Sequence, residues 1–413
     1  MPIGNVKNLS QQVLSQKETI FNIVIDGIPD HLVQDFSVAE LSLTESLLTP
    51  SVMGTISVQD VTHTNPVKIL DNFAGKSVAY FVEKPLLAAL GLNSKFVTDH
   101  VIYRIDERKP INYGTEQYKI HSCHNSLLKN AASRVSKSWN FVTPSDVAND
   151  MLTNILGVDQ YEIESSSPAK TYYADNIHPF QVLTEQADSA LAQGTDPSFL
   201  HYMSHRNGGT HHFRSVKALT QQSNAFQFVY NEMGSGLSYE IPSSILKYEF
   251  PCDFDILSDI LNGINIDGSD NVSSVVYNPF NFIRNLIGTV SPIASLGGAI
   301  VNAAFTNKSS AQSEGTAETD VERFLSLRQA RLSLLDQDKI ALRITVPWNP
   351  NIYAGDMISV NFVNKPTTPN EEVKPDYGTG EYLIVTLTHI IKAGGYAITV
   401  LDCVARSVGL GIV

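Results

Sequence analysis

Residues 18 to about 125 contain short runs in which apolar and polar side chains alternate. Phe21, Ile23 and Ile25 occupy alternate positions of the first run, and Gly27 ends it. In a later run Val101, Tyr103 and Ile105 are expected to share one face. Similar runs cover 41–44, 56–59, 78–82 and 118–120. A period of two, interrupted by turn residues, predicts strands of a small antiparallel barrel or sandwich.

From about residue 125 the spacing becomes helical. Thr143 precedes Pro144 as an N-cap precedes a proline in the first helical position, and apolar residues then fall four apart. The pairs His178-Pro179 and Asp196-Pro197 repeat this order of an N-cap residue and a proline. The pattern predicts three helices, which begin at Pro144, Pro179 and Pro197 and end before Gly157, Gly194 and Gly208. Short strands are expected around them, within 161–173 and 210–230.

The C-terminal part returns to alternation. Strands are predicted near 239–250 and 340–346, and Gly355-Asp356 reads as a turn before a strand with Ile358, Val360 and Phe362 on one face. Segments 382–391 and 396–404 are predicted to form a closing hairpin. Between the β segments, residues 251–320 are irregular and rich in Asn, Ser and Gly, and a helix is expected over 321–335.

The predicted fold class is mainly β with an α+β middle. Two small antiparallel β-barrels are joined by a helical unit, and an insertion interrupts the second barrel. The predicted parts are an N-terminal arm 1–17, a first barrel 18–125, an α+β connecting unit 126–238, a second barrel 239–250 and 336–408, and an insertion 251–335 with an apolar segment and a helix.

Composition adds a constraint on assembly. Only 17% of the 413 residues are charged, below the roughly 25% of typical soluble domains. Obligate interfaces are depleted of charge, so permanent contacts are the favoured explanation. A β-rich surface that uses Ser, Thr and Asn is the alternative. The net charge of −13 argues against a protein that grips nucleic acid by its phosphates, and does not exclude a channel through which nucleic acid slides.

The cysteines and the apolar segments indicate where the chain folds and whether it enters a membrane. The three cysteines are scattered and odd in number, which argues against a disulfide framework and favours folding in a reducing cytosol. The first 17 residues lack the apolar core of a signal peptide. The stretch Phe280–Phe305 is apolar, but Arg284 and Pro292 interrupt it. It is interpreted as a buried or docking segment rather than a membrane span.

Two clusters have the residue types of a metal site: His121, Cys123 and His124, and a denser one of His201, His205, His211 and His212. His121, Cys123 and His124 are too closely spaced to reach one ion, because in a strand His121 and Cys123 share one face while His124 points to the other. His201 and His205 are four apart on the predicted helix, as in zinc proteases, but the glutamate is missing. These are interpreted as surface or interface histidines, which would make assembly sensitive to pH.

No catalytic constellation emerges. Glycoside hydrolysis needs an opposed carboxylate pair in a recognisable setting, and no such setting is found. A nucleophile elbow is missing, and the glycine-containing run 288–298 lacks the lysine of a phosphate loop. No catalytic, cofactor-binding or metal-binding residue is assigned, and no cofactor is expected.

Three segments resemble a known family. They are 36–41 with 57–60, then 197–203 with the following Arg206–Gly209 and the strand through Phe213, and finally 354–356 with 380–384, 388–389 and 396–400. They are similar to segments of the baseplate hub proteins of contractile phage tails, which are related to phage late-control D proteins and to the hub portion of type VI secretion spike proteins. The matched positions are structural: Phe199, Leu200, Gly208, Gly355, Asp356, Gly380, Tyr382, His389, Tyr396 and Thr399.

The resemblance implies a function and a set of partners. In that family two barrels per subunit form a homotrimer, whose six barrels make a pseudo-sixfold ring with an axial channel. The ring joins a hexameric tail tube, or a tube-initiator protein, to a trimeric spike, and baseplate wedge proteins surround it. DNA would pass without specific binding. The chain is therefore expected in the virion tail baseplate, assembled in the host cytoplasm, without a membrane span. Because no needle or lysozyme domain follows Val413, the spike is expected to be a separate chain.

Two alternatives remain from other classes. One is a tail-tip enzyme that degrades peptidoglycan, which would need an acidic pair in a cleft or a fused catalytic domain. The other is a carbohydrate-binding tail protein, which would need exposed aromatic side chains. The chain has two tryptophans, and Trp348, beside Pro347 at a strand end, is expected to be a packing residue.

Overall fold

The computed structural model describes residues 19–26, 36–60, 75–112, 115–192, 196–231, 241–251, 341–363, 378–392 and 396–408, together with Arg328, Leu332 and Leu335. The predicted N-terminal arm and the apolar stretch 280–305 lie outside these residues. So do the loop 364–377, the hairpin turn 393–395 and most of the predicted helix 321–335.

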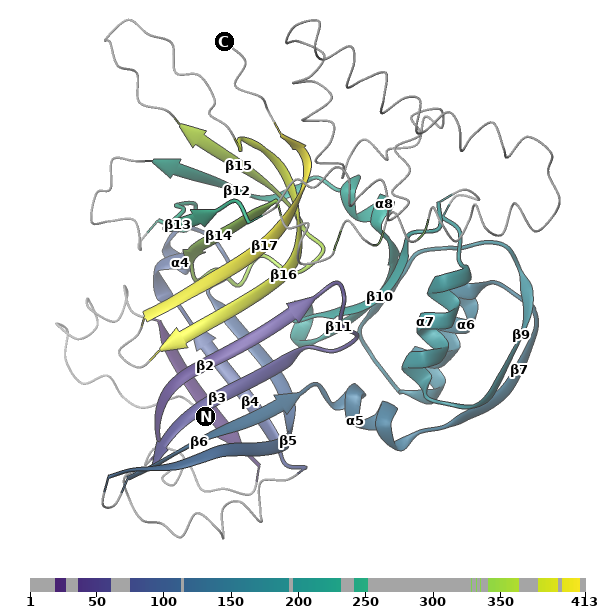
Figure 1. Ribbon diagram of the computed structural model, residues 1–413, viewed down its shortest axis with the longest axis horizontal. Coiled ribbons are helices and arrows are strands. Elements are labelled where there is room, and N and C mark those ends of the chain that lie inside the picture. The colour runs from purple at the N-terminus through teal and green to yellow at the C-terminus, as the bar shows by residue number, and fades with distance from the viewer. Residues whose placement is uncertain are drawn as a thin grey trace, which may run out of the picture.

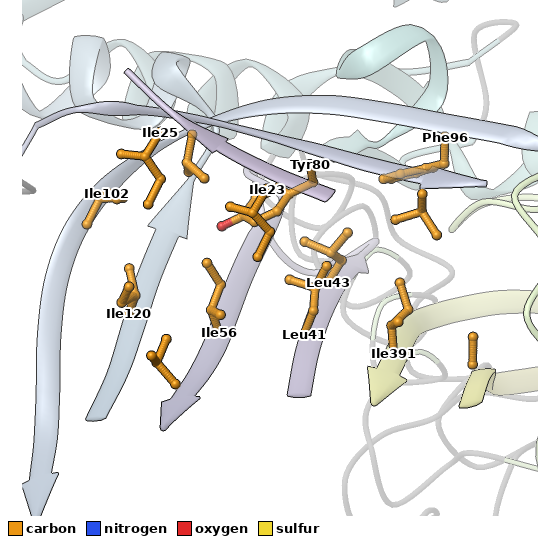
Figure 2. Packing of buried hydrophobic residues seen from close by; sticks show 14 of the residues in the cluster. Ile23, Ile25, Leu41, Leu43, Ile56, Tyr80, Phe96, Ile102, Ile120 and Ile391 are labelled. Atoms are coloured by element: carbon orange, nitrogen blue, oxygen red, sulfur yellow. The ribbon is translucent and has the colours of Figure 1, made fainter. Parts of the chain in front are cut away.

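The first β unit is an antiparallel sheet with the strand order β1-β4-β5-β6-β3-β2 (Figure 1). Its strands are β1 (Ile20–Ile25), β2 (Phe36–Ser46), β3 (Met53–Asp60), β4 (Ser77–Glu83), β5 (Lys95–Asn112) and β6 (Thr115–Cys123), with helix α4 (Pro85–Ala89) between β4 and β5. The alternating apolar positions face one core, which includes Ile23, Leu41, Ile56 and Tyr80 (Figure 2). Burial of this apolar face is what the period of two predicts.

The second β unit closes on itself. Its strands are β12 (Asn224–Asn231), β13 (Lys247–Glu249), β14 (Leu342–Pro347), β15 (Met357–Val363), β16 (Gly380–Lys392) and β17 (Tyr396–Val408). Neighbours run β12-β15-β16-β17-β14-β13, with only β12 and β15 parallel. The ring is completed just before β13, because Val229 of β12 donates to the carbonyl of Ser243 and accepts from the amide of Ile245. The predicted β16–β17 hairpin is confirmed.

The connecting unit is the α+β middle. It contains α5 (Asn125–Ala132), β7 (Val135–Val142), α6 (Pro144–Asp150) continued as a π-helix (Met151–Ile155), β8 (Tyr161–Ile163), β9 (Lys170–Ile177), α7 (Pro179–Ser189), β10 (Phe199–Ser204), a 3-10 turn (Arg206–Gly208), β11 (Thr210–Ser215) and α8 (Val216–Thr220). Helices α6 and α7 pack together, with β7 and β9 as a separate two-stranded sheet (Figure 1). Thr143 caps α6 by accepting from the amide of Asp146, so the capping prediction is confirmed.

The two β units are parts of one continuous sheet. Strand β2 of the first unit pairs with β16 of the second, in a register that runs from Ser46 opposite Thr386 to Glu40 opposite Lys392. Ile391 therefore packs into the first core beside Leu41 (Figure 2). Trp348, which follows β14, belongs to the same core. The mainly β class with an α+β middle is confirmed. The predicted domain boundaries stay a prediction.

The predicted helix after Asp196-Pro197 is wrong. Residues 199–204 form strand β10, which pairs with β11 on one side and, through Met203, with Ser46 of β2 on the other. All six positions of β10 are buried. A strand covered on both faces shows no alternation, so its short apolar run resembled a helix in the sequence.

The expected alternation in β5 is also corrected. Val101, Tyr103 and Ile105 do not share a face, because the register with β6 shifts between Ile102 and Arg104. The bulge buries Ile102 and leaves the Tyr103 side chain 41% exposed. Within the described ranges, no helix has the length and apolarity needed to cross a membrane.

Candidate functional site: a buried histidine junction

The three units meet at a cluster of histidines. Six of the chain's 11 histidines are buried there, and the partly buried His124 adjoins them. The buried six are His100 of β5, His201 of β10, His205 after β10, His211 and His212 of β11, and His389 of β16. We call these seven residues the histidine junction.

Glu45 links all three units at one point. It continues the alternation of Leu41 and Leu43 in β2, so its carboxylate points to the buried face. That carboxylate accepts from the backbone amides of His205 and Ala354, each at 2.5 Å. Its Oε2 also lies 3.1 Å from Nδ1 of His205, and both side chains are fully buried. A buried carboxylate needs such partners, and here they come from the connecting unit and the second β unit.

On one side of Glu45, the rings of His205 and His100 stack with centroids 5.6 Å apart. Nδ1 of His100 is hydrogen-bonded to the Ser122 hydroxyl at 3.1 Å, and that hydroxyl is hydrogen-bonded to Tyr80 at 2.6 Å. His389 lies nearby, since Phe96 contacts both its ring and that of His205. Nδ1 of His389 is hydrogen-bonded to Thr399 at 2.9 Å. The junction is thus fixed to strands of both β units.

A second stack lies within the connecting unit. The rings of His201 and His211 are parallel within 8°, with centroids 5.4 Å apart, and Nε2 of His201 lies 3.2 Å from Nδ1 of His211. Nε2 of His211 is hydrogen-bonded to Ser126 at 2.9 Å, and Ser126 is hydrogen-bonded to His124, the N-cap of α5. The chain of bonds therefore runs from β10 to the start of α5.

His212 takes the opposite face of β11. Its ring stacks on Tyr202 at 4.6 Å, and its Nε2 is hydrogen-bonded to Ser204 at 2.8 Å. Its Nδ1 lies 3.2 Å from Glu162, whose carboxylate is about half exposed. The hydrogen bond from His212 holds the pKa of Glu162 down to about 2.

Burial keeps most of these imidazoles neutral. Desolvation lowers the pKa of His201 and His389 to about 3 and that of His124 to about 4. It also places the pKa of His100 and His211 well below the usual 6.5, and neighbouring histidines add to the effect. The pKa of His212 is lowered by burial and partly restored by Glu162. Removing a charge from water is unfavourable, so each ring resists protonation.

Arg206 and Asp356 form an ion pair at the edge of the junction. Nη2 of Arg206 lies 2.6 Å from Oδ1 of Asp356, and the guanidinium lies 4.8 Å from the ring of Tyr353. Burial raises the pKa of Asp356 to about 6, against the opposing effect of Arg206. Gly355 beside it has φ +90°, as predicted for the turn, and a Cβ there would lie 2.5 Å from the Tyr202 hydroxyl.

The structure gathers several of the family-motif positions at this junction. Leu200, Gly355, Asp356, His389 and Thr399 are buried in or next to it, and the carbonyl of Gly208 accepts from Thr98 of β5. Phe199 belongs to the core of the connecting unit. Gly380 and Tyr382 lie in β16, where the Tyr382 hydroxyl donates to the carbonyl of Gly378. Tyr396 begins β17 and is 40% exposed. Their role as motif residues stays a prediction.

The two clusters with metal-ligand residue types are arranged differently from the sequence prediction. His201 and His205 do not share a helix face, because His201 is in a strand and both are buried, so their interpretation as surface histidines is wrong. His121 pairs with Asp106 at 2.9 Å, while Cys123 is a free buried thiol. Among the described residues no three His, Cys, Asp or Glu side chains converge as a metal site.

Sequence reasoning missed Glu45 and His100. A signal for Glu45 was present, since its position is in phase with Leu41 and Leu43 on the buried face of a predicted strand. Arg206 belongs to a motif segment, but nothing local indicates its pairing with Asp356, just as nothing local marks His100, because their partners are distant in the sequence.

No protein-family model and no curated protein matches the chain. Solved structures do match. The 43 kDa tail protein of prophage MuSo2 from Shewanella oneidensis aligns over 94% of this chain and 98% of its own length, with a TM-score of 0.51 and 9% identity. A tail protein from Neisseria meningitidis MC58 aligns over 94% and 96%, with a TM-score of 0.50 and 10% identity.

This chain has the fold of a phage tail protein. The resemblance seen in the sequence motifs is therefore confirmed at the level of the fold. A weaker similarity, with a TM-score of 0.48 and 10% identity, is to the E. coli c3393 protein, a type VI secretion component described as similar to the T4 tail proteins gp27 and gp5. It covers 94% of this chain and 77% of that protein.

Proposed function

We propose that the protein is the structural baseplate hub of a contractile phage tail. The observation that carries this proposal is the match over nearly the whole length of two tail proteins, which includes both β units and the unit between them. The motif segments at both ends of the chain support the same family. No enzymatic step belongs to this role.

The coupling of the two β units supports a ring built from trimers. Pairing of β2 with β16 and the bonds of Glu45 fix the two units relative to each other. Three chains, each with two rigidly joined β units, would present six similar units around one axis. Such a ring matches a hexameric tube above and a trimeric spike below. A cyclic trimer uses two different faces of each subunit, and interfaces above about 2,000 Å² are expected for an obligate assembly.

The remaining partners follow from that position. A tail-tube or tube-initiator protein would bind above the ring, the spike would bind below it, and baseplate wedge proteins would bind outside it. DNA would pass through the axial channel without specific binding. The net charge of −13 favours a neutral or acidic lining that does not hold phosphates. The location would be the virion tail.

Electron microscopy of the purified chain tests this proposal. Views along the symmetry axis should show a threefold ring with six lobes and a central opening. Globular particles without an opening, at concentrations where the chain is fully assembled with a spike protein, would contradict it. A turbidity assay on cell-wall material separates the hub from the enzymatic alternative, because the hub should cause no clearing.

A further inference from the structure

The histidine junction differs from the cores on either side of it. Each unit has an apolar cluster of its own, and a fourth apolar cluster joins Leu47, Leu200 and Met357 from the three units. Beside this packing, the first β unit and the connecting unit meet through the stack of His100 on His205. Two stacks are buried, His100 on His205 and His201 on His211.

We propose that the histidine junction is an acid-sensitive joint, which opens between the connecting unit and the two β units when the pH falls below about 6.5, before the β units unfold. The proposal concerns this chain alone and does not depend on its place in a phage tail.

Three of the rings have a nitrogen with no acceptor inside the closed junction. Nε2 of His100 and of His389 is buried without a hydrogen-bond partner, as is Nδ1 of His201. A proton added at one of these atoms creates a buried donor without an acceptor, and in either stack it places a charge against a second imidazole. Opening of the junction exposes these atoms to water and removes both penalties.

The charged groups that face the junction do not offset this effect. They are Glu45, Glu162, Asp356, Arg206, Arg214 and Lys129. Among the described residues of the junction, Glu45 is the one carboxylate fully buried beside a ring, and two backbone amides already bind it. Of the junction histidines Glu162 pairs with His212, and the cations Arg206 and Arg214 oppose protonation of that ring. The neighbouring Tyr80, Tyr202 and Cys123 have raised pKa values and stay neutral.

The direction of the pH effect follows from proton counts. A histidine with a pKa of about 3 in the closed junction and about 6.5 in the open one binds more protons when open. Opening is therefore favoured as the pH falls below 6.5, and between pH 7.5 and 5.0 each such residue raises the opening constant about 30-fold. Asp356 acts in the opposite direction, since its raised pKa of about 6 makes the closed state bind one more proton between pH 4 and 6. Six histidines with lowered pKa values outweigh one aspartate.

Two tryptophans make the joint observable. Trp348 packs in the core of the first β unit with its ring 6.0 Å from that of His389, whereas Trp139 lies in the core of the connecting unit. The full chain would be titrated from pH 7.5 to 4.5 as Trp139→Phe, which leaves Trp348 as the reporter of opening. Far-UV circular dichroism would report the strands in the same samples. We expect the Trp348 signal to change at a higher pH than the strand signal, with uptake of about three or more protons.

A histidine variant tests the assignment. His201→Gln should reduce the proton uptake on opening by about one and the rise of the opening constant between pH 7.5 and 5.0 by about 30-fold. His121→Gln is the matched control, because His121 lies outside the junction against Asp106, and it should leave the transition unchanged. If His201→Gln does not fold, His389→Gln carries the same expectation. Coincident loss of both signals, or an uptake that His201→Gln and His389→Gln leave unchanged, would overturn the proposal.

Discussion

Glu45 and His205 lie 3.1 Å apart with both side chains fully buried, although 160 positions separate them in the sequence. The same carboxylate binds the amide of Ala354, a further 149 positions along the chain. One side chain of the first β unit therefore binds backbone amides of the other two units. These polar contacts add to an apolar cluster that also spans the three units.

Glu45→Gln should destabilise the chain by about 3 kcal/mol. In the glutamine one carboxylate oxygen is replaced by an NH₂ group. This NH₂ group faces a backbone N–H, so two buried donors meet and neither has an acceptor. Urea denaturation at pH 7.5 measures the change. Glu40→Gln on the same strand is the control, because Glu40 pairs with Lys392 at 3.4 Å near the surface and should cost less than about 0.5 kcal/mol. Equal effects of the two variants would contradict the role of Glu45.

Gly355→Ala should cost about 3 kcal/mol. The residue has φ +90°, and the added Cβ would lie 2.5 Å from the hydroxyl of Tyr202. Gly91→Ala isolates the backbone contribution, since Gly91 has φ +74° with open space around it, and about 1 kcal/mol is expected there. Tyr202→Phe should recover part of the loss of Gly355→Ala in a double-mutant cycle. Additive effects would show that the hydroxyl contact carries no cost.

Arg206→Ala should destabilise the chain by about 2 kcal/mol, because it leaves Asp356 buried without its cation and removes the contact with Tyr353. Arg104→Ala is the comparison. Arg104 also has a close pair, at 2.7 Å from Asp106, but its side chain is 64% exposed and its removal should cost less than about 0.5 kcal/mol. Thermal unfolding of the two variants measures both losses of stability. Equal losses would show that the length of the ion pair, and not its burial, determines the destabilisation.

Arg328 binds the connecting unit from a distant part of the chain. Its guanidinium donates to the carbonyls of Pro197 and Phe199 at 2.8 and 3.0 Å and pairs with Asp188 at 2.6 Å. Arg328→Met keeps the apolar stem and leaves these acceptors unpaired, so a loss of about 2 kcal/mol is expected in urea denaturation. Arg134→Met removes one exposed bond, to the carbonyl of Asn176, and should be nearly neutral. A neutral Arg328→Met would show that the contact does not hold this segment.

The sequence was sufficient to predict the helices and strands that have one buried and one exposed face. Strands with one buried face, such as β1 and β14, alternate in burial as predicted, and helices begin where Thr143 and His178 precede a proline. Strand β10 was mistaken for a helix because both of its faces are buried. The bulge at Tyr103 also escaped prediction, since it depends on pairing with β6.

The site was harder to predict than the fold, because its contacts are set by strand pairing across the chain. His201 and His211 are brought together by the β10–β11 hairpin, and His100 reaches His205 only through tertiary packing. The motif positions Gly355 and Asp356 pointed to the right turn, but their partners Tyr202 and Arg206 left no local pattern.

The mass of the purified chain in solution, by light scattering on a size-exclusion column, tests the central claim most directly. The hub account predicts a stable species of about three times the chain mass of 45.3 kDa, alone or after addition of the spike protein. A chain that stays monomeric in both conditions would contradict the trimeric ring and return attention to a binding protein that acts as a single copy.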